Sequence, residues 1–471
     1  MQAQGRCVLP ADEAGRVLDR LAGLEKVISP EAVRQACSAT GRVNGRACKL
    51  PHEVMLWVVL AMGLLTDLPI AQVFAHARRM RLSALGKASA TGSDPRRSAL
   101  CQARQRLGVA PVRHLFEQVV RPLAQAEVPG GFYRGLRLMA FDSTVNDTPD
   151  TPANERAFGR PRGGDRGDGA FPQIRKLSLV ELGTHVELAF QIKPCRTSEQ
   201  TMLAPLLRHL TSQMLLLLDR GFFSYSLWKT LAERGVKLLV RGKQNLKLEP
   251  LRRLADGSYI AKIYASDKDR RHDRQGIEVR VIKYSLDDPQ RTGHGETHVL
   301  LTNLLDAEQM PAQELIVLYH ERWEEELVFD EQKTHQDPRR PTKPAHLRSE
   351  TPAGVVQEVY ALSLAHFVLR SLMFAAAEKT ALDPDRLSFT GCFHVLQCRL
   401  PECESRSDAT LQQWYECLLE ELADQRLPPR ANRINPRVIK RKMSKWPKKR
   451  PHHRRPTGLR KTFAEAVFME S

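Results

Sequence analysis

Three carboxylates in this chain stand where acidic side chains hold divalent metal ions for phosphodiester chemistry. Asp142 ends an apolar run, LRLMAFD, and Asp219 ends a second run, QMLLLLD. Glu326 lies in YHERWEEELVFDEQK, whose pattern predicts a helix. Two metal ions held by such carboxylates bind the attacking and leaving oxygens on either side of the phosphorus. Mg²⁺ suits the site, because it prefers hard oxygen ligands and keeps positions for water and a substrate phosphate.

A second group of polar side chains lies on the predicted helix. At 100° per residue, Tyr319, Arg322, Glu326 and Lys333 fall within roughly 60° of one another on one face. A face turned toward a core would be apolar at these positions. A solvated face is the alternative, although it rarely places an aromatic ring in register with three charges. We therefore predict that the two cations bind a phosphate backbone while the Glu326 carboxylate reaches the metal.

The motifs together resemble one family. The chain is similar to DDE transposases of the insertion-sequence-four type, whose signature is Tyr, two residues, Arg, three residues, Glu, six residues and Lys. Tyr319, Arg322, Glu326 and Lys333 match this signature at every spacing. The resemblance extends to five further segments, so it covers most of the chain: FDSTVNDTPDTPANERAFGRP, LDRGFFSYSLWKTLAERG, the N-terminal RACKLPHEVMLWVVLAMGL and RQRLGVAPVRHLFE, and the C-terminal NPRVIKRKMSKWPKK.

The resemblance implies a DNA transposase of an insertion sequence. Asp142, Asp219 and Glu326 would be the catalytic metal ligands for two Mg²⁺ ions, for which Mn²⁺ would substitute. The side chains expected to contact DNA are Tyr319, Arg322 and Lys333. The partners would be double-stranded DNA at the element's ends and in the target, bound by a homodimer or a higher assembly. Two alternatives stay open: an inactive or non-catalytic DNA-binding derivative, and a metal-dependent nuclease without strand transfer.

The order of elements predicts an α/β fold with a ribonuclease-H-like catalytic core. Apolar strands are predicted at LRLMAFD, QMLLLLD and KLLVRG, and the runs KLSLVEL and HVELAFQI predict a hairpin around Gly183 and Thr184. SLWKTLAERG predicts a helix that ends at Gly235. Strand, hairpin, strand, helix, strand is the order of such a core. A mostly β insertion would follow it, an all-α domain would precede it, and a basic tail would end the chain.

We expect three domains. Residues 1–130 carry helical periodicity and several arginines, so they are predicted to be a DNA-binding domain, with a dimerising or packing scaffold as the alternative. Residues 131–425 would form the catalytic domain, with the β insertion at about 243–310. Some relatives use a Trp in the insertion to stack a flipped base. Residues 243–321 contain no Trp and no Phe, so base flipping stays open here.

The basic tail at residues 426–471 carries most of the net charge. Residues 426–461 hold 15 Lys or Arg and no Asp or Glu, whereas the rest of the chain has 57 basic and 54 acidic residues. Binding to a polyanion releases condensed counterions, so we expect the tail to bind DNA non-specifically. A solvated tail is the alternative. A membrane-surface role is disfavoured, because the tail lacks an apolar face and a lipidation motif.

No membrane span, secretion signal or zinc motif is expected. The apolar stretch at 54–65 is too short to cross a bilayer. The N-terminus does not resemble a secretory signal, which favours the cytoplasm. The resemblance to transposases implies, in addition, a bacterial protein associated with the nucleoid. The nine cysteines include no CxxC pair, and the cluster of Cys392, Cys398, Cys403 and His394 fits no standard zinc spacing.

Overall fold

A computed structural model describes residues 24, 26–44, 50–78, 95–161, 169–243, 246–289, 294–337, 347–400, 408–428 and 460–469. The chain divides into two compact units. Unit 1 comprises Met1–Phe132, Asp142–Arg208 and Glu324–Leu427, and unit 2 comprises Tyr133–Phe141, His209–Trp323 and Pro428–Ser471. Most of the basic tail, residues 429–459, lies outside the described residues, as do Arg79, Arg81 and Cys403.

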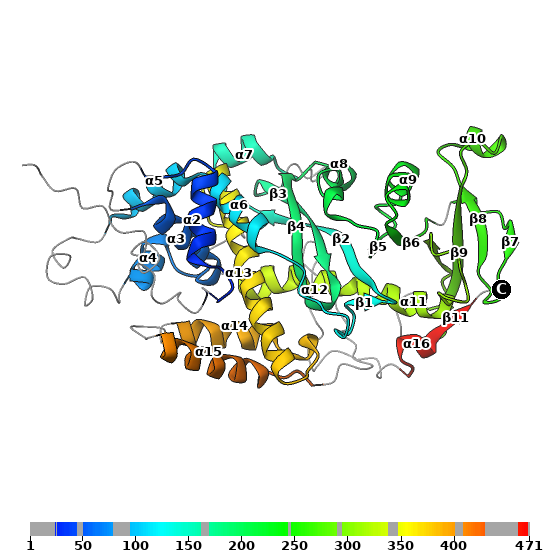
Figure 1. Cartoon of the computed structure of the whole chain (residues 1–471). Helices are drawn as coiled ribbons and strands as arrows, with labels where there is room; N and C mark the ends of the chain where they lie inside the picture. The colour runs from blue at the N-terminus through cyan, green and yellow to red at the C-terminus, as the bar shows by residue number, and fades with distance from the viewer. Residues whose placement is uncertain are drawn as a thin grey trace, which may run out of the picture. The chain divides into compact units, whose positions relative to one another are not determined.

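The N-terminal part of unit 1 is helical, as its periodicity predicts. Its helices are α2 (Pro30–Ala39), α3 (His52–Leu64), α4 (Ile70–Arg78), α5 (Arg97–Leu107) and α6 (Ala110–Val119) (Figure 1). The Ser29 hydroxyl caps α2 by accepting a hydrogen bond from the Ala32 amide, and Pro30 opens the first turn. Arg104 of α5 donates to Gln357 and to the Gly354 carbonyl oxygen, so this arginine helps to hold the unit together.

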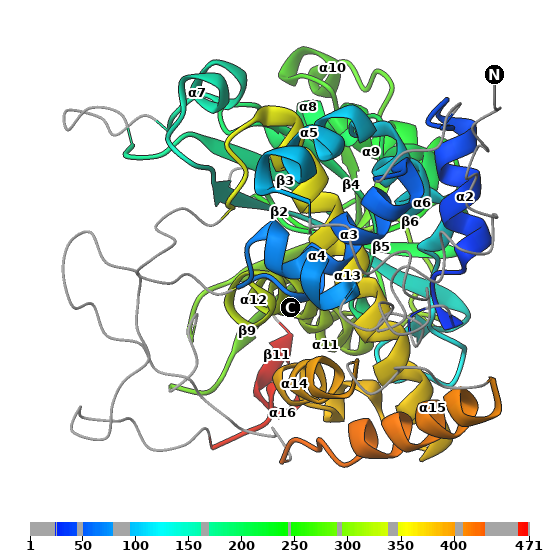
Figure 2. The ribbon, with the colours of Figure 1, turned by 90° about the vertical axis from the view of Figure 1, so that its left-hand side faces the viewer.

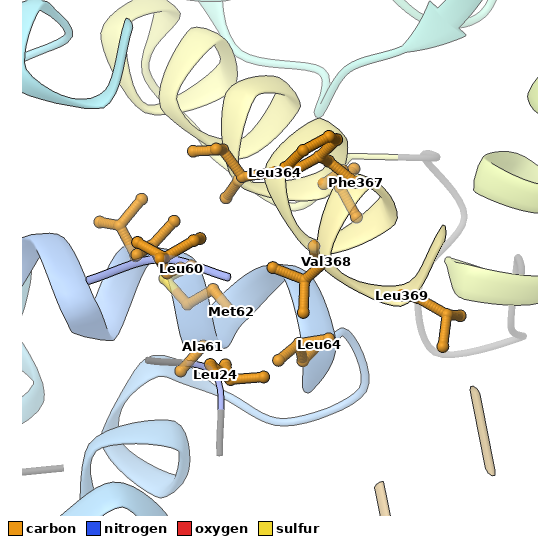
Figure 3. Packing of buried hydrophobic residues seen from close by; sticks show 14 of the residues in the cluster. Leu24, Leu60, Ala61, Met62, Leu64, Leu364, Phe367, Val368 and Leu369 are labelled. Carbon is orange, nitrogen blue, oxygen red and sulfur yellow. The ribbon is translucent and has the colours of Figure 1, made fainter. Parts of the chain in front are cut away.

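The core of unit 1 forms where α3 packs against α13 (Pro352–Lys379) (Figure 3). Residues Val54–Leu64 of α3 are buried on all sides, which explains the apolar run at 54–65. The two helices approach closely, because a Cβ at Gly63 would lie 2.2 Å from the Ala361 carbonyl oxygen. Within the described residues, only α13 has the length and hydropathy of a membrane span, and 83% of its apolar window is buried, as in a core helix.

Two further helices, α14 (Phe389–Arg399) and α15 (Asp408–Ala423), lie side by side near the end of unit 1 (Figure 2). Both contact α13 and extend the same hydrophobic core. Cys392 of α14 is buried and its thiol donates to the Leu422 carbonyl oxygen, whereas Cys398 is exposed. These two cysteines of the predicted cluster therefore differ in burial, and Cys392 has a packing role.

Unit 1 also holds the predicted hairpin. Strands β3 (Gln173–Glu181) and β4 (Val186–Pro194) pair antiparallel, with a bulge between Leu179 and Val180. The 3₁₀ turn Leu182–Thr184 joins them, and His185 follows it in the left-handed conformation with φ 57°. The second half of β2 (Leu136–Asp147) lies next to β3. Short helices are α7 (Pro152–Phe158), α8 (Glu199–Leu203), the 3₁₀ turn η4 (Leu207–His209) and the 3₁₀ turn η7 (Pro384–Arg386).

Unit 2 contains the parallel strands of the core. The first half of β2 pairs in parallel with β5 (Met214–Leu218), which pairs in parallel with β6 (Lys237–Arg241). Helix α9 (Tyr225–Glu233) connects β5 to β6, and Gly235 follows it with a positive φ of 76°. Strand, hairpin, strand, helix, strand is therefore the observed order, and the predicted α/β, ribonuclease-H-like fold class is confirmed.

The predicted β insertion is also present in unit 2. After β6 the sheet continues with β10 (His298–Thr302), β9 (Ile277–Leu286), β8 (Tyr259–Ile263) and β7 (Arg252–Arg253), all antiparallel. The insertion also holds α10 (Asp267–Arg271), which the sequence pattern did not indicate. Two elements from the end of the chain, α16 (Phe463–Ala466) and β11 (Val467–Met469), belong to this unit, and β11 pairs with β9. The two-residue strand β1 (Phe132–Tyr133) pairs with β2.

Candidate active site

Asp142 lies inside a strand, whereas the sequence places it at a strand end. The apolar run stops at Asp142, but β2 continues to Asp147, because the β-branched and polar residues that follow keep the extended conformation. The Asp142 side chain is half-buried, and its Oδ1 accepts a 2.7 Å hydrogen bond from the Ser143 amide. The carboxylate is thus oriented by its own backbone.

Ser143, the neighbour of Asp142 on β2, contacts a second carboxylate, that of Glu199 on α8. The Ser143 hydroxyl donates to Glu199 Oε1 at 2.5 Å. The guanidinium of Arg175 donates both to the Ser143 hydroxyl at 3.1 Å and to Glu199 at 2.9 Å. Because Glu199 is paired with an arginine, its charge is compensated within unit 1.

Asp219 stands where the sequence predicts, directly after β5 in unit 2. Its side chain is half-buried. Its backbone carbonyl oxygen accepts a hydrogen bond from the Phe222 amide at 3.0 Å, which turns the chain away from the strand end. Leu218, the residue before it, is fully enclosed, so the aspartate marks the point where the buried strand reaches the surface of its unit.

Tyr319 and Arg322 lie near the same strand end in unit 2. The Tyr319 hydroxyl donates to the Leu218 carbonyl oxygen at 3.0 Å, and the phenol is buried. Burial raises the pKa of Tyr319, and the charge of Asp219 raises it further against the opposing effect of Arg322. The Arg322 guanidinium is buried and lies 5.9 Å from the centre of the Tyr319 ring. Tyr319 is therefore neutral and bonded to the strand that precedes Asp219.

The predicted single helix around Glu326 is divided into four segments. They are α11 (Ala312–His320), the 3₁₀ turn η5 (Glu321–Trp323), α12 (Glu324–Asp330) and the π-helix η6 (Glu331–Gln336). The four signature side chains each stand on a different segment. A common helical face required a constant 100° per residue, and a 3₁₀ turn and a π-turn both change that angle. The prediction of one regular face is therefore wrong.

Glu326 and Lys333 belong to unit 1 together with Asp142. Glu326 is exposed on α12. The ammonium of Lys333 donates to Thr144 Oγ1 at 2.9 Å and to the Val145 carbonyl oxygen at 2.7 Å. Unit 1 thus joins the helical segment of Glu326 to the strand of Asp142, whereas Asp219 lies in unit 2. The assignment of the six site residues stays a prediction.

A cluster that the sequence did not indicate lies at the first residue of α12. Among the described residues, His185, Glu324 and Asp385 form a group whose ligand atoms all lie within 4.8 Å of one another. Burial and the Arg370 charge lower the pKa of His185, but the surrounding carboxylates outweigh them and raise it to about 9. The imidazole lies 3.0 Å from Glu324 and 3.4 Å from Asp385, so the three residues form an ion-pair cluster whose donor atoms are close enough together to hold a metal ion.

The chain matches two protein families along most of its length. Residues 18–117 match the family described as insertion element 4 transposase N-terminal. Residues 133–368 match the transposase DDE domain. The second match includes Asp142, Asp219, Glu326 and the rest of the signature.

Two curated proteins of Escherichia coli (strain K12) are similar to this chain. One is the transposase InsG for insertion sequence element IS4, which is 30% identical over 437 residues, 91% of this chain and 93% of that protein. The other is the putative transposase InsZ, which is 30% identical over 205 residues, 44% of this chain and 65% of that protein. A cryo-electron microscopy structure of a piggyBac transposase synaptic complex with hairpin DNA aligns over 88% of both chains at 11% identity, with a TM-score of 0.38 that is too low to support an argument.

Proposed function

The chain belongs to the insertion-sequence-four family of DDE transposases, and we propose that it cuts the ends of its own element with a two-metal site built from Asp142, Asp219 and Glu326. As a member of this family it is an insertion-sequence DNA transposase, an enzyme that cleaves DNA, transfers strands and depends on a divalent metal ion. The observation that carries the assignment of residues is the signature, which is complete at every spacing within the matched DDE domain.

The donor set fits a hard divalent cation. Asp142 and Asp219 are half-buried carboxylates, and Glu326 is an exposed one, so an ion bound to them remains accessible to a substrate phosphate. We propose two Mg²⁺ ions there, with Mn²⁺ as a substitute. When bound, the ions activate the attacking oxygen and stabilise the charge on the leaving oxygen.

The protein's own residues orient the carboxylates and hold DNA in this proposal. The Ser143 amide fixes one oxygen of Asp142, and the Tyr319 hydroxyl ties α11 to the strand that precedes Asp219. Arg322 and Lys333 supply positive charge for phosphates, because guanidinium and ammonium groups form short charge-assisted hydrogen bonds with phosphate oxygens.

We further propose a division of labour along the chain. The helical residues 1–130 would recognise the element's ends, residues 131–425 would carry the chemistry, and the basic stretch after residue 426 would bind any duplex. Cutting two ends together requires that they be held in one complex, so at least a homodimer should assemble on DNA. The enzyme would work in the bacterial cytoplasm, where the nucleoid supplies both element and target.

One assay tests the proposal against its alternatives. Labelled DNA that carries the element's end is incubated with the protein, Mg²⁺ and a target plasmid, and the products are resolved on a denaturing gel. Joined products support transposition by this site. Nicked ends without joining indicate a nuclease, and DNA that is bound but uncut indicates an inactive derivative. Loss of both products in the Glu326→Gln variant is required for the proposed site.

A further inference from the structure

The helix that carries Glu326 is held at both ends by one imidazole. Nε2 of His185 lies 3.0 Å from Glu324 Oε2, at the first residue of α12. Nδ1 of the same ring lies 3.1 Å from Glu331 Oε1, at the first residue after α12. Glu326 stands between the two carboxylates, so a single side chain from the β3–β4 turn fixes the segment that presents it.

The backbone at His185 is built for this contact. His185 adopts a left-handed φ of 57°, a conformation that non-glycine residues rarely take. The ring is nevertheless almost fully buried, with 2% of the residue exposed. Such backbone strain persists where the surrounding structure determines it, and it is often found at functional sites. Here the unusual conformation places a buried ring between two acidic residues.

Glu331 ties the same segment to the core helix of unit 1. His366 and Arg370, one turn apart on α13, donate to the Glu331 carboxylate at 2.9 Å and 3.0 Å. Although burial raises the pKa of Glu331, the charges of Arg370 and His185 outweigh it and hold the pKa well below its ordinary value. The carboxylate is therefore ionised and fully paired inside unit 1.

The π-helix that follows is held by polar side chains as well. Gln332 accepts a hydrogen bond from the Lys176 ammonium at 2.9 Å, and Gln336 donates to the carbonyl oxygens of Gly63 and Leu362 at 3.0 Å and 2.9 Å. π-Helices are rare and occur frequently at functional sites. In this one, the buried contacts fix the direction in which Lys333 leaves the segment toward β2.

Buried ion pairs add little net stability compared with well-packed apolar side chains, and their better attested contribution is a unique geometry. The geometry fixed here is that of the segment bearing Glu326 and Lys333. We propose that His185 is a positioning residue for DNA cleavage: by bridging Glu324 and Glu331 it holds α12 in the one orientation that presents Glu326 to the metal. This inference rests on the proposed role of Glu326 and adds a residue to that site.

Two substitutions separate the ends of the bridge. The amide nitrogen of Asn overlays Nδ1 of His, and that of Gln overlays Nε2. His185→Asn therefore keeps the contact to Glu331 and loses Glu324, whereas His185→Gln keeps Glu324 and loses Glu331. Asn also tolerates the left-handed backbone at this position. Both variants should bind end-containing DNA as the parent does.

The readout is single-turnover cleavage of saturating end-containing DNA at a series of Mg²⁺ concentrations, well below the melting temperature of each variant. We expect the cleavage rate to fall, or the half-saturating Mg²⁺ concentration to rise, by about 10- to 100-fold. Glu358→Gln is the matched control. Glu358 is as buried as His185 and accepts hydrogen bonds from the backbone amides of Arg348 and Ser349, but none of these residues belongs to the segment 324–336. Its Mg²⁺ dependence should match the parent even if its melting temperature falls.

The inference is overturned if both His185 variants cleave at the parental rate and with the parental Mg²⁺ dependence. It is also overturned if their cleavage rate falls no more than that of a Glu358→Gln protein with the same melting temperature. If neither His185 variant folds, Glu324→Ala is used instead, because Glu324 is partly exposed and its replacement should be tolerated. A parental Mg²⁺ dependence of cleavage in Glu324→Ala also overturns the inference. Glu326→Gln is measured in parallel. If it still cleaves, the proposed function fails; if it is inactive while the His185 variants behave as the parent, only the positioning role fails.

Discussion

Lys333 donates a 2.9 Å hydrogen bond to the hydroxyl of Thr144, two residues after Asp142 on β2. The lysine that we propose to contact DNA is therefore also a structural link between two elements of unit 1. Its two contacts, to Thr144 and to the Val145 carbonyl oxygen, place its ammonium beside the strand that carries Asp142. The two roles make different predictions.

Lys333→Ala removes both the proposed phosphate contact and the link to β2. A charge-assisted hydrogen bond contributes about 1.5–3 kcal/mol, so cleavage should fall by roughly 10- to 150-fold. Thr144→Val is the matched control, because it removes only the hydroxyl that accepts from Lys333. Single-turnover cleavage near normal in Thr144→Val supports the phosphate role. Equal losses in the two variants would assign Lys333 to structure alone.

The three carboxylates should be individually indispensable. Asp142→Asn, Asp219→Asn and Glu326→Gln each keep the shape of the side chain and remove its charge, so each should abolish cleavage with Mg²⁺ while end-containing DNA still binds. Asp150→Asn serves as the control, since Asp150 is exposed and pairs with Arg160 on the surface. Gel-shift and cleavage assays on the same preparations give both quantities. More than a few per cent of parental cleavage in any of the three variants would remove that residue from the site.

The stability of the protein should depend on pH through His185. Its pKa of about 9 in the folded state lies above its ordinary value of 6.5. A base whose pKa is raised by folding contributes its full stability below the lower value, and that contribution is lost as pH rises through the higher one. The free energy of unfolding should therefore fall by up to about 3 kcal/mol between those two values.

Urea denaturation at several pH values measures this dependence. Glu324, Glu331, Asp385 and Arg370 face the ring, but the pKa of Asp385 is raised only to about 6 and that of Glu331 is lowered, so neither titrates in the same window. In the His185→Gln variant, the free energy of unfolding should change less across this pH range than it does in the parent. An identical pH dependence in parent and variant would show that the ring is neutral.

The basic stretch should supply salt-sensitive affinity without specificity. Residues 429–459 carry 12 Lys or Arg, and each phosphate contact adds about 0.9 to the slope of log affinity against log salt. Replacing these residues by Gln and Ser should weaken binding to any duplex and lower that slope, while preference for the element's ends survives. Truncation is the poorer experiment, because it also removes β11 from unit 2. Loss of end preference with an unchanged slope would contradict this assignment.

Local sequence patterns correctly predicted those elements whose conformation depends mainly on their own residues. The hairpin turn at Gly183 and the helix end at Gly235 were both located, because backbone conformation and apolar alternation are local properties. The divided helix around Glu326 was missed. A helical wheel assumes a constant period, whereas here the π-turn is held by His185 and His366, which lie far away in the sequence. The cluster of His185, Glu324 and Asp385 was not predicted either, because its members also lie far apart in the sequence.

The last strand of the chain has a consequence for synthesis. Strand β8 pairs with Ile277–Val281 of β9, and β11 pairs with Tyr284, Ser285 and Leu286. Unpaired strand edges recruit other strands and lead to aggregation. Because β11 follows β9 only after α11 to α15 in the chain, the edge of β9 stays open until those helices and β11 have been synthesised. A copy of the element with a stop codon just before Val467 would then produce a protein prone to aggregate, and it would be silenced by insolubility although every proposed site residue is present.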